Sequence, residues 1–398
     1  MPTPTAFTWA HRDDDPAALA LQKPPVPGWS MPDIARQVEA LRRIKTKIPA
    51  WYREGLTLPS GVPLEQCSSE ATARFKAGLF SGARALDLTG GLGVDTYFLA
   101  QSFEAVDYVE QQEALCAAAR HNFEVLGQGN VRVHHSTAAA FLERAEASAY
   151  DLIYLDPARR GDRQQRVFRL EDCSPDVLGL RQALFRLSDK VLLKTAPLLD
   201  LQLAMAQLQQ VARIWVLAVG DECKEVLYGL DKNAVFQESI PIEAVQIKKD
   251  GSATTFAFDF EAERAAAAPL SLPLQYLYEP HAAILKAGAF KSFAVRYGLS
   301  KLHPHSHLYT SDRWQPEVPG RGFEVKAVCK YDKKSVAAWV PEGSANIATR
   351  NFPESAETVR KKLGLKEGGA WYLFATTEQS GKKVVLVCQK PDFAVQGL

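Results

Sequence analysis

The stretch ALDLTGGLGVDT, residues 85–96, constrains the fold of this chain more than any other segment. An apolar run ends in Asp87, and Gly90, Gly91 and Gly93 follow almost at once. Glycine loses more backbone freedom on folding than other residues, so such a cluster indicates a special backbone conformation or a close approach. A strand that turns through glycines into a helix is typical of an open α/β sheet, where ligands bind at the carboxyl ends of the strands.

The chain around this stretch alternates between short β-prone segments and helical segments. This alternation predicts βαβ units and a parallel, Rossmann-like sheet. The segment EVLYGL, residues 225–230, follows the last of these strands after a short turn, and we expect it to return antiparallel as a seventh strand. The six preceding segments span residues 83–89, 105–110, 131–135, 150–156, 190–195 and 212–220.

The segments before and after this alternation have a different character. Apolar residues recur at helical spacing within residues 31–54, which predicts a helical N-terminal segment. They are Ile34, Val38, Leu41, Ile44 and Ile48. The Ala/Pro/Leu-rich stretch 261–274 indicates a boundary. The tail then predicts a small α+β domain with strands, one helix at 354–364 and a final hairpin. Its expected strands before the hairpin span residues 323–331, 336–340 and 346–352.

We therefore divide the chain into four regions. A helical region covers 1–75, a sheet domain 76–262, a connecting region 263–320 and an α+β domain 321–398. Charge is split along the chain: residues 281–398 carry 18 Lys and Arg against 10 Asp and Glu, a net of +8, whereas 1–280 carry 29 against 36, a net of −7. A basic part of this kind indicates either a polyanionic partner or a solvated basic surface.

Cysteine usage and hydropathy indicate the cellular compartment. The six cysteines are far apart and form no C-x-x-C pair, so we expect reduced thiols rather than disulfides or zinc. No run of 18 apolar residues predicts a membrane span, and the first residues lack the pattern of a secretory signal. These features predict a cytoplasmic protein.

Two ligand classes use a glycine turn after the first strand. The dinucleotide pattern G-x-G-x-x-G is broken because Thr96 stands where its third glycine belongs. The S-adenosylmethionine (SAM) loop of class I methyltransferases fits Asp87–Gly93 better, and it makes Thr89 and Asp95 candidate cofactor contacts. A tight turn without a ligand is the alternative.

Acidic and hydroxyl residues at the next strand ends extend this candidate site. Glu110 closes the second predicted strand and can accept hydrogen bonds from both ribose hydroxyls, although it could instead favour the following helix. Ser136, after the third strand, is a candidate contact near the adenine, or a helix N-cap together with Thr137.

The fourth predicted strand ends in DPARRG, which we interpret as the transfer centre. Asp156 follows the strand directly, so its carboxylate would lie beside the cofactor, where positioning governs a direct methyl displacement. Arg159 is a candidate catalytic and substrate-binding residue, and Arg160 and Arg163 are candidate substrate contacts, because guanidinium groups match phosphate oxygens. The alternative is a solvated charged loop.

The chain resembles the bacterial class I SAM-dependent methyltransferases that carry a C-terminal THUMP-like domain. The resemblance implies a SAM enzyme that acts on RNA, with the cofactor pocket at Asp87, Gly90, Gly91, Gly93, Glu110 and Asp156. It rests on LEQCSSEATARFKA, DLTGGLGVDTYF, YLDPARRG, LLKTAPLLD, DECKEVL, HPHSHLYTS and ATRNFPESAETVRKKLG.

The acceptor atom is less constrained. No aromatic residue follows Pro157, which disfavours methylation of an exocyclic amine. DPAR is nearer to the D-P-P-R of 5-methyluridine enzymes, which need a cysteine nucleophile, and Cys173 and Cys223 are the candidates. A non-catalytic RNA-binding protein, or a methyltransferase of a small molecule or protein, are the alternative functions.

The histidines of HPHSHLYTS alternate along the chain. His303, His305 and His307 would share one face of a strand and could bind a metal. Pro304 interrupts such a strand and no carboxylate or cysteine is near, so we expect no metal and interpret the histidines as a polar interdomain surface.

Overall fold

The computed structural model describes residues 3–59, 61–159, 170–235 and 239–392. Its contacts divide the chain into two compact units. The first comprises residues up to 219 together with 224–236 and 247–252, and the second comprises 220–223, 237–246 and the chain from 253 onward.

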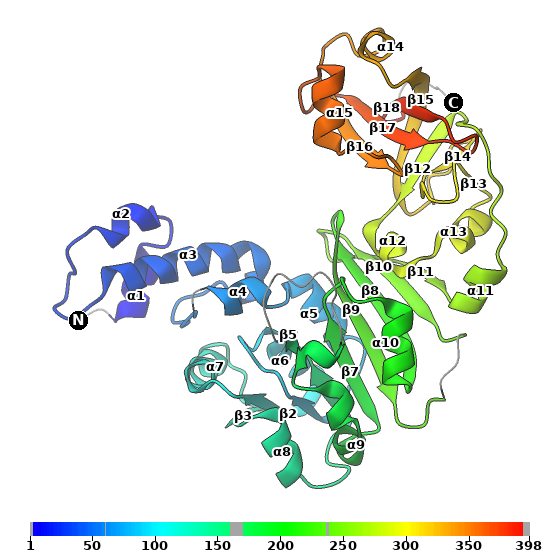
Figure 1. The fold of residues 1–398 in the computed structure, drawn as a ribbon. Coiled ribbons are helices and arrows are strands. Elements are labelled where there is room, and N and C mark those ends of the chain that lie inside the picture. The colour runs from blue at the N-terminus through cyan, green and yellow to red at the C-terminus, as the bar shows by residue number, and fades with distance from the viewer. Residues whose placement is uncertain (1–2, 60, 160–169, 236–238, 393–398) are drawn as a thin grey trace. The chain divides into compact units, whose positions relative to one another are not determined.

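The first unit begins with helices (Figure 1). They are α1 (Pro4–Ala10), α2 (Pro16–Ala20), α3 (Met31–Lys47), the short 3₁₀ helix η1 (Pro49–Trp51), α4 (Val62–Gln66) and α5 (Glu70–Ala77). Helix α3 starts where Ser30 accepts a hydrogen bond from the Asp33 amide, and it buries one apolar face as its periodicity predicts. Ile44 and Trp51 are fully buried in one core cluster with Phe98 and Tyr108. The second half of α3 is therefore part of the core of this unit, whereas α1, α2 and the start of α3 form a cluster of their own.

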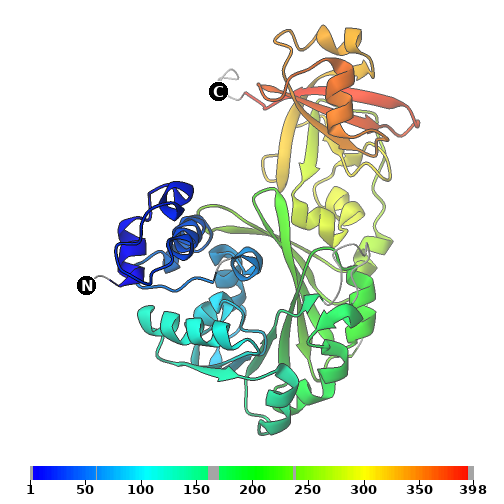
Figure 2. The same cartoon turned by 60° about the vertical axis from the view of Figure 1, so that its left-hand side comes forward.

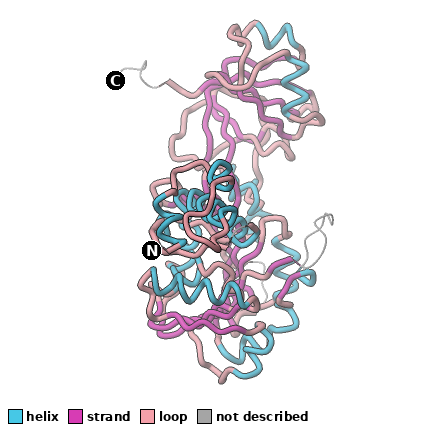
Figure 3. The backbone as a smooth tube through the Cα atoms, turned by 90° about the vertical axis from the view of Figure 1, so that its left-hand side faces the viewer, coloured by secondary structure: helices cyan, strands magenta, loops and turns pink. Residues whose placement is uncertain are grey.

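The rest of the first unit alternates strands with helices, as predicted. In Figure 3 its strands lie side by side with helices around them. The elements are β1 (Gly82–Asp87), α6 (Val94–Leu99), β2 (Phe103–Glu110), α7 (Glu113–Val125), β3 (Val131–His135), α8 (Ala138–Arg144), β4 (Leu152–Leu155), β5 (Ala158–Arg159), the 3₁₀ helix η2 (Leu170–Asp172), β6 (Cys173–Ser174), α9 (Val177–Leu187), β7 (Lys190–Thr195), α10 (Leu201–Leu208), β8 (Val211–Val219) and β9 (Glu222–Asp231).

Seven of these strands are neighbours in the order β8-β9-β7-β4-β1-β2-β3. Strand β1 pairs in parallel with β2 and β4, β2 with β3, and β4 with β7, whereas β9 runs antiparallel to β7. The predicted antiparallel seventh strand is confirmed. Because β9 runs the opposite way, its first residues lie at the same edge as the carboxyl ends of β1, β4 and β7. Residues from distant parts of the chain meet at that edge.

The second unit contains β10 (Ile242–Ile247) and a second sheet with its helices (Figure 2). The further elements are β11 (Ala253–Phe258), α11 (Phe260–Ala265), β12 (Tyr276–Pro280), α12 (Ala282–Ala287), α13 (Phe290–Arg296), β13 (Ser300–Lys301), β14 (Tyr309–Ser311), β15 (Gly320–Lys330), α14 (Lys333–Ala337), β16 (Asn346–Arg350), α15 (Ala356–Leu363), β17 (Trp371–Thr377) and β18 (Lys383–Gln389).

Seven of these strands form one sheet in the order β13-β14-β12-β15-β18-β17-β16. The predicted final hairpin is confirmed as the antiparallel pair β17 and β18, and the predicted helix as α15. Strand β15 pairs with both β12 and β18, so residues on either side of position 320 share this sheet. Phe323 and Phe374 stack edge to face in its core.

One predicted strand is wrong. Residues 336–340 read as a strand because they are apolar and β-branched, but α14 occupies Lys333–Ala337. Asp332 caps this helix by accepting a hydrogen bond from the Ser335 amide at 2.8 Å, and Val336 points into the core. The cap outweighs the weak strand preference of this short segment.

Candidate functional site

A cavity of about 560 Å³ opens at the carboxyl ends of β1, β2, β3 and β4 in the first unit. Its lining includes the predicted residues Asp87, Thr89, Gly90, Gly91, Gly93, Asp95, Glu110, Ser136 and Asp156. The topology therefore gathers all nine predicted cofactor-contact residues around one space. Gln66, Cys67 and Ser68 line the cavity as well, and they come from the N-terminal helical region.

The glycine loop after β1 is shaped by aromatic side chains of the protein itself. A Cβ on Gly90 would overlap the ring of Tyr108, and a Cβ on Gly93 would lie 2.9 Å from Phe123. Gly91 and Gly93 also have positive φ, at 53° and 88°, where other residues are disfavoured. Tyr108 donates a hydrogen bond from its hydroxyl to the Gly91 carbonyl at 2.6 Å. Packing beneath the loop explains Gly90 and Gly93, and the positive φ explains Gly91.

Asp87 holds this loop from within the protein. It is buried, and its two oxygens accept hydrogen bonds from the Thr89 amide at 3.0 Å and from the Thr96 hydroxyl at 2.6 Å. Burial raises the pKa of Asp87 to about 7, against the two hydrogen bonds, which lower it. Both carboxylate oxygens of Asp87 therefore accept hydrogen bonds from the protein itself, from the loop and from the start of α6.

Glu110, at the end of β2, is hydrogen-bonded to the other side of the loop. One oxygen of its carboxylate accepts a hydrogen bond from the Gly91 amide at 3.0 Å, and the other accepts one from the Gln112 amide at 2.8 Å. A carboxylate oxygen can accept two hydrogen bonds, so each retains one free acceptor position. Nearby, Ser136 donates its amide to the Glu110 carbonyl, and its hydroxyl oxygen accepts from Arg144.

Asp156 lies directly after β4 and is held from two sides. Its amide donates to the Thr89 hydroxyl oxygen at 2.6 Å, and its carboxylate forms an ion pair with Lys194 at the end of β7. The Asp156 side chain is 32% exposed and that of Lys194 only 12%. A carboxylate thus faces the cavity with a buried cation behind it.

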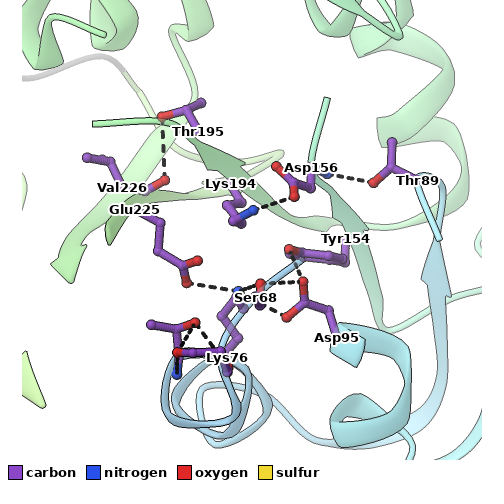
Figure 4. A network of polar contacts seen from close by, with 12 residues as sticks. Ser68, Lys76, Thr89, Asp95, Tyr154, Asp156, Lys194, Thr195, Glu225 and Val226 are labelled. Atoms are coloured by element: carbon purple, nitrogen blue, oxygen red, sulfur yellow. Dashed lines mark hydrogen bonds and ion pairs between the residues drawn. The ribbon is translucent and has the colours of Figure 1, made fainter. Parts of the chain in front are cut away.

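A second lysine and two more carboxylates lie beside this pair (Figure 4). The Lys76 ammonium, 1% exposed, is 2.8 Å from Glu225, 3.0 Å from Asp95 and 2.7 Å from the Ser68 hydroxyl. Asp95 also accepts hydrogen bonds from Ser68 and from the Tyr154 hydroxyl at 2.9 Å. This network joins α5, α6, β4 and β9.

The charges of this network influence one another. Burial would lower the pKa of Lys194, but the carboxylates of Asp156, Glu225 and Asp95 outweigh burial and raise it. Burial would likewise raise the pKa of Asp95, but the ammonium groups of Lys76 and Lys194 lower it. Three carboxylates and two ammonium groups leave this cluster with one negative charge in excess.

The predicted arginines are only partly described. The backbone of Arg159 lies in β5, which pairs with β6. Arg160 and Arg163 fall outside the described residues. The two cysteine candidates do not line the cavity: Cys173 is buried in β6, and Cys223 lies near the start of β9. Among the described residues, Cys67 is the cysteine that lines the cavity, and burial raises the pKa of its thiol.

The three predicted histidines lie in the turn between β13 and β14 rather than on a strand. His303 contacts Asn351 at 3.0 Å, and His307 stacks on Phe290 with ring centroids 3.6 Å apart. Within the described residues no group of three His, Cys, Asp or Glu side chains could hold a metal ion. None of the described helices is long and apolar enough to span a membrane.

Sequence reasoning missed five residues of the site, namely Ser68, Lys76, Tyr154, Lys194 and Glu225. All five lie in segments that carry the family resemblance. A lysine in an apolar strand, as in KVLLKT, is a signal that could have identified Lys194.

Comparisons with known proteins agree with this architecture. Residues 276–319 match a family model described as a ferredoxin-like domain, and residues 320–390 match one described as THUMP domain-like. The crystal structure of a protein from Porphyromonas gingivalis W83, assigned as a methyltransferase, is 33% identical, with a TM-score of 0.88 and 98% of each chain covered. Two uncharacterised S-adenosylmethionine-dependent methyltransferases, from Mycobacterium tuberculosis strains CDC 1551 and H37Rv, are each 25% identical over 76% of this chain and 80% of theirs.

The strand order and the cavity at the carboxyl ends of the strands define the class I methyltransferase fold. The similarity to the Porphyromonas protein extends over 98% of both chains and therefore establishes the family as well as the fold. The chain belongs to the class I SAM-dependent methyltransferases that carry a THUMP-like C-terminal domain.

Proposed function

We propose that this enzyme transfers the methyl group of SAM to RNA, in a tRNA or an rRNA. One observation carries the proposal: Glu110, the glycine loop and Asp156 line a single cavity in a chain that also contains a THUMP-like region. When bound, SAM would supply a methyl group on a positively charged sulfur, ready for direct displacement.

The cavity suits this cofactor on three grounds. Each oxygen of the Glu110 carboxylate has one acceptor position left, which matches the two hydroxyls of a ribose. The excess negative charge of the network around Lys76 and Lys194 favours a cationic sulfur nearby. The volume of about 560 Å³ is in the range of cofactor pockets.

The residues of the site divide into two roles under this proposal. Asp87 and Thr89 keep the loop in shape, and Glu110 orients the cofactor through its ribose. Asp156 faces the transfer centre, where a fixed carboxylate positions the acceptor group. Arg159, Arg160 and Arg163 follow Asp156 along the chain and stay our candidates for contacts with RNA phosphates.

The basic segment 281–398, which lies within the second unit, supports RNA as the partner. Arg321, Arg350 and Lys390 surround the buried carboxylate of Glu279 and form what we call the C-terminal basic cluster. Arg321 and Arg350 are ion-paired to Glu279, and Lys390 lies 4.1 Å from the ring centroid of Phe323. Asp221 also acts on Arg321 and Lys390, so three cations against two carboxylates leave one positive charge for phosphates.

The test is transfer of a labelled methyl group from SAM to total RNA taken from a strain that lacks the gene. We expect label in RNA with the wild-type protein and a large loss with Asp156→Ala at nearly unchanged SAM affinity. The matched control is Asp189→Ala, an exposed aspartate just before β7.

Other outcomes would favour other functions. SAM binding without any label in RNA would favour a small-molecule or protein acceptor. RNA binding without SAM binding would favour a non-catalytic RNA-binding protein with a methyltransferase fold.

A further inference from the structure

Two lysines, Lys76 and Lys194, lie among the carboxylates near Asp156. Burying an ammonium group is costly unless carboxylates pair with it, and here Lys76 is buried and Lys194 is 12% exposed, paired with three carboxylates between them. Lys194 belongs to β7 and Asp156 follows β4, so the sheet brings the pair together at the edge where the cavity opens.

We propose that the acceptor is a hydroxyl oxygen, the ribose 2′-hydroxyl of RNA, with Asp156 accepting its proton and Lys194 stabilising the oxygen as the proton leaves. This inference rests on the proposed RNA methyltransferase function and names the acceptor atom. In the step, a bond forms between the 2′-oxygen and the methyl carbon. The carbon–sulfur bond breaks with its electron pair left on sulfur, and the hydroxyl proton passes to the Asp156 carboxylate.

A hydroxyl acceptor requires both members of this pair. A hydroxyl is a weak acid and a weak nucleophile, so a base must take its proton and a cation must stabilise the negative charge that develops on oxygen. Asp156 is one of several carboxylates that line the cavity, and it is the one to which the ammonium of Lys194 is bound. Asp95 and Glu225 keep Lys194 charged, and Lys76 holds those two carboxylates in place.

The cavity lining disfavours the nitrogen atoms of a base. A flipped base needs side chains on which to stack. Among the described residues that line the cavity, none is aromatic.

A ring carbon is disfavoured for a different reason. Methylation at C5 of a pyrimidine requires a thiolate that attacks the ring. Cys67 is the cysteine among the described cavity-lining residues, but burial raises the pKa of its thiol, and its sulfur donates to the Leu64 carbonyl at 3.2 Å. A buried thiol of this kind is a poor nucleophile at neutral pH.

The test identifies the methylated nucleoside. RNA from a strain lacking the gene is incubated with the full-length protein and SAM labelled in its methyl group, then digested to nucleosides for mass spectrometry. We expect the label in 2′-O-methylnucleosides, on the sugar fragment, and in linkages that resist alkaline cleavage.

Three outcomes are distinguishable. Label on a sugar supports the inference. Label on a base overturns it and leaves the proposed RNA methyltransferase function intact. Absence of label from RNA, with SAM bound, overturns both.

A variant pair tests the role of the lysine. Lys194→Met should lower the rate of transfer by roughly a hundredfold or more while SAM affinity stays nearly unchanged, because one stabiliser of the developing oxyanion is lost. Lys190→Met removes an exposed lysine from the same strand and should leave the rate unaltered. Transfer by Lys194→Met at the wild-type rate would contradict the inference, and the methylated nucleoside remains readable if this variant fails to fold.

Discussion

At the scale of single residues, the glycine loop is fitted to the aromatic side chains beneath it. Gly90→Ala would place a methyl group inside the ring of Tyr108. In Gly91→Ala the nearest atom to the new methyl group is 3.8 Å away, so its cost is that of holding alanine at a positive φ. We expect Gly90→Ala to cost about 1–3 kcal/mol or more of stability and Gly91→Ala about 1–2 kcal/mol. Denaturant unfolding of the two variants measures the difference, and equal midpoints would show that Tyr108 can move aside.

The second prediction at this scale concerns Asp87 and pH. Its pKa, raised to about 7 by burial, exceeds the ordinary value of 3.8, so between these pH values the folded state binds more protons than the unfolded state. The free energy of unfolding therefore falls as pH rises through this window, by up to about 4 kcal/mol from this group. Asp87→Asn does not titrate and should remove that decline. Parallel curves for wild type and variant between pH 4 and pH 7 would refute this account of Asp87.

At the scale of elements, helix α3 contributes to the core of the methyltransferase unit. Ile44 is fully buried in the cluster that contains Phe98 and Tyr108, so Ile44→Ala should cost about 2–5 kcal/mol. Lys45→Ala, at the next and exposed position, should have little effect. Hydrogen exchange of the β1 and β2 amides provides the measurement. Unchanged protection in Ile44→Ala would mean that the N-terminal helices fold apart from the sheet.

Most elements could be predicted from the sequence because their signals are local. The strands of the sheet are short apolar runs between helices, and β9 follows β8 after one turn. The prediction of a strand at residues 336–340 is wrong because the hydrogen bond that caps α14 at Asp332 favours a helix there. The cavity followed from topology, since Glu110 and Asp156 each end a parallel strand. Their roles as cofactor and transfer residues stay predictions.

The charged network could not be predicted in the same way. Lys76 and Glu225 are 149 positions apart, and Lys194 and Asp156 are 38 apart. Such pairs depend on the antiparallel direction of β9 and on the register of β7 against β4, which no local pattern specifies. Lys194 and Glu225 leave a sign in the sequence because they are charged residues in apolar strands, whereas Lys76 lies in a helix and leaves none of this kind.

At the scale of the whole molecule, RNA binding should depend on salt through the C-terminal basic cluster. Deleting residues 320–390 would remove strands that share a sheet with β12, so point substitutions are the sharper probe. Replacing Arg350 and Lys390 together by Ala should flatten the slope of log affinity against log salt by roughly 1.4 for single-stranded RNA, if both contact phosphate. Lys45→Ala with Lys232→Ala, both exposed in the first unit, is the control. An unaltered slope in the Arg350 and Lys390 variant would show that RNA does not contact the C-terminal basic cluster.

The central claim is that the cavity after β1 and β2 is the methyl-donor site, and calorimetric titration of SAM into the full-length protein tests it most directly. We predict one site per chain, with affinity reduced roughly ten- to a hundredfold by Glu110→Ala, because hydrogen bonds to a charged group contribute about 1.5–3 kcal/mol. Glu104→Ala, exposed on the same strand, should bind SAM as the wild type does. Equal SAM affinity in folded Glu110→Ala and wild-type protein, or no binding to either, would contradict the account.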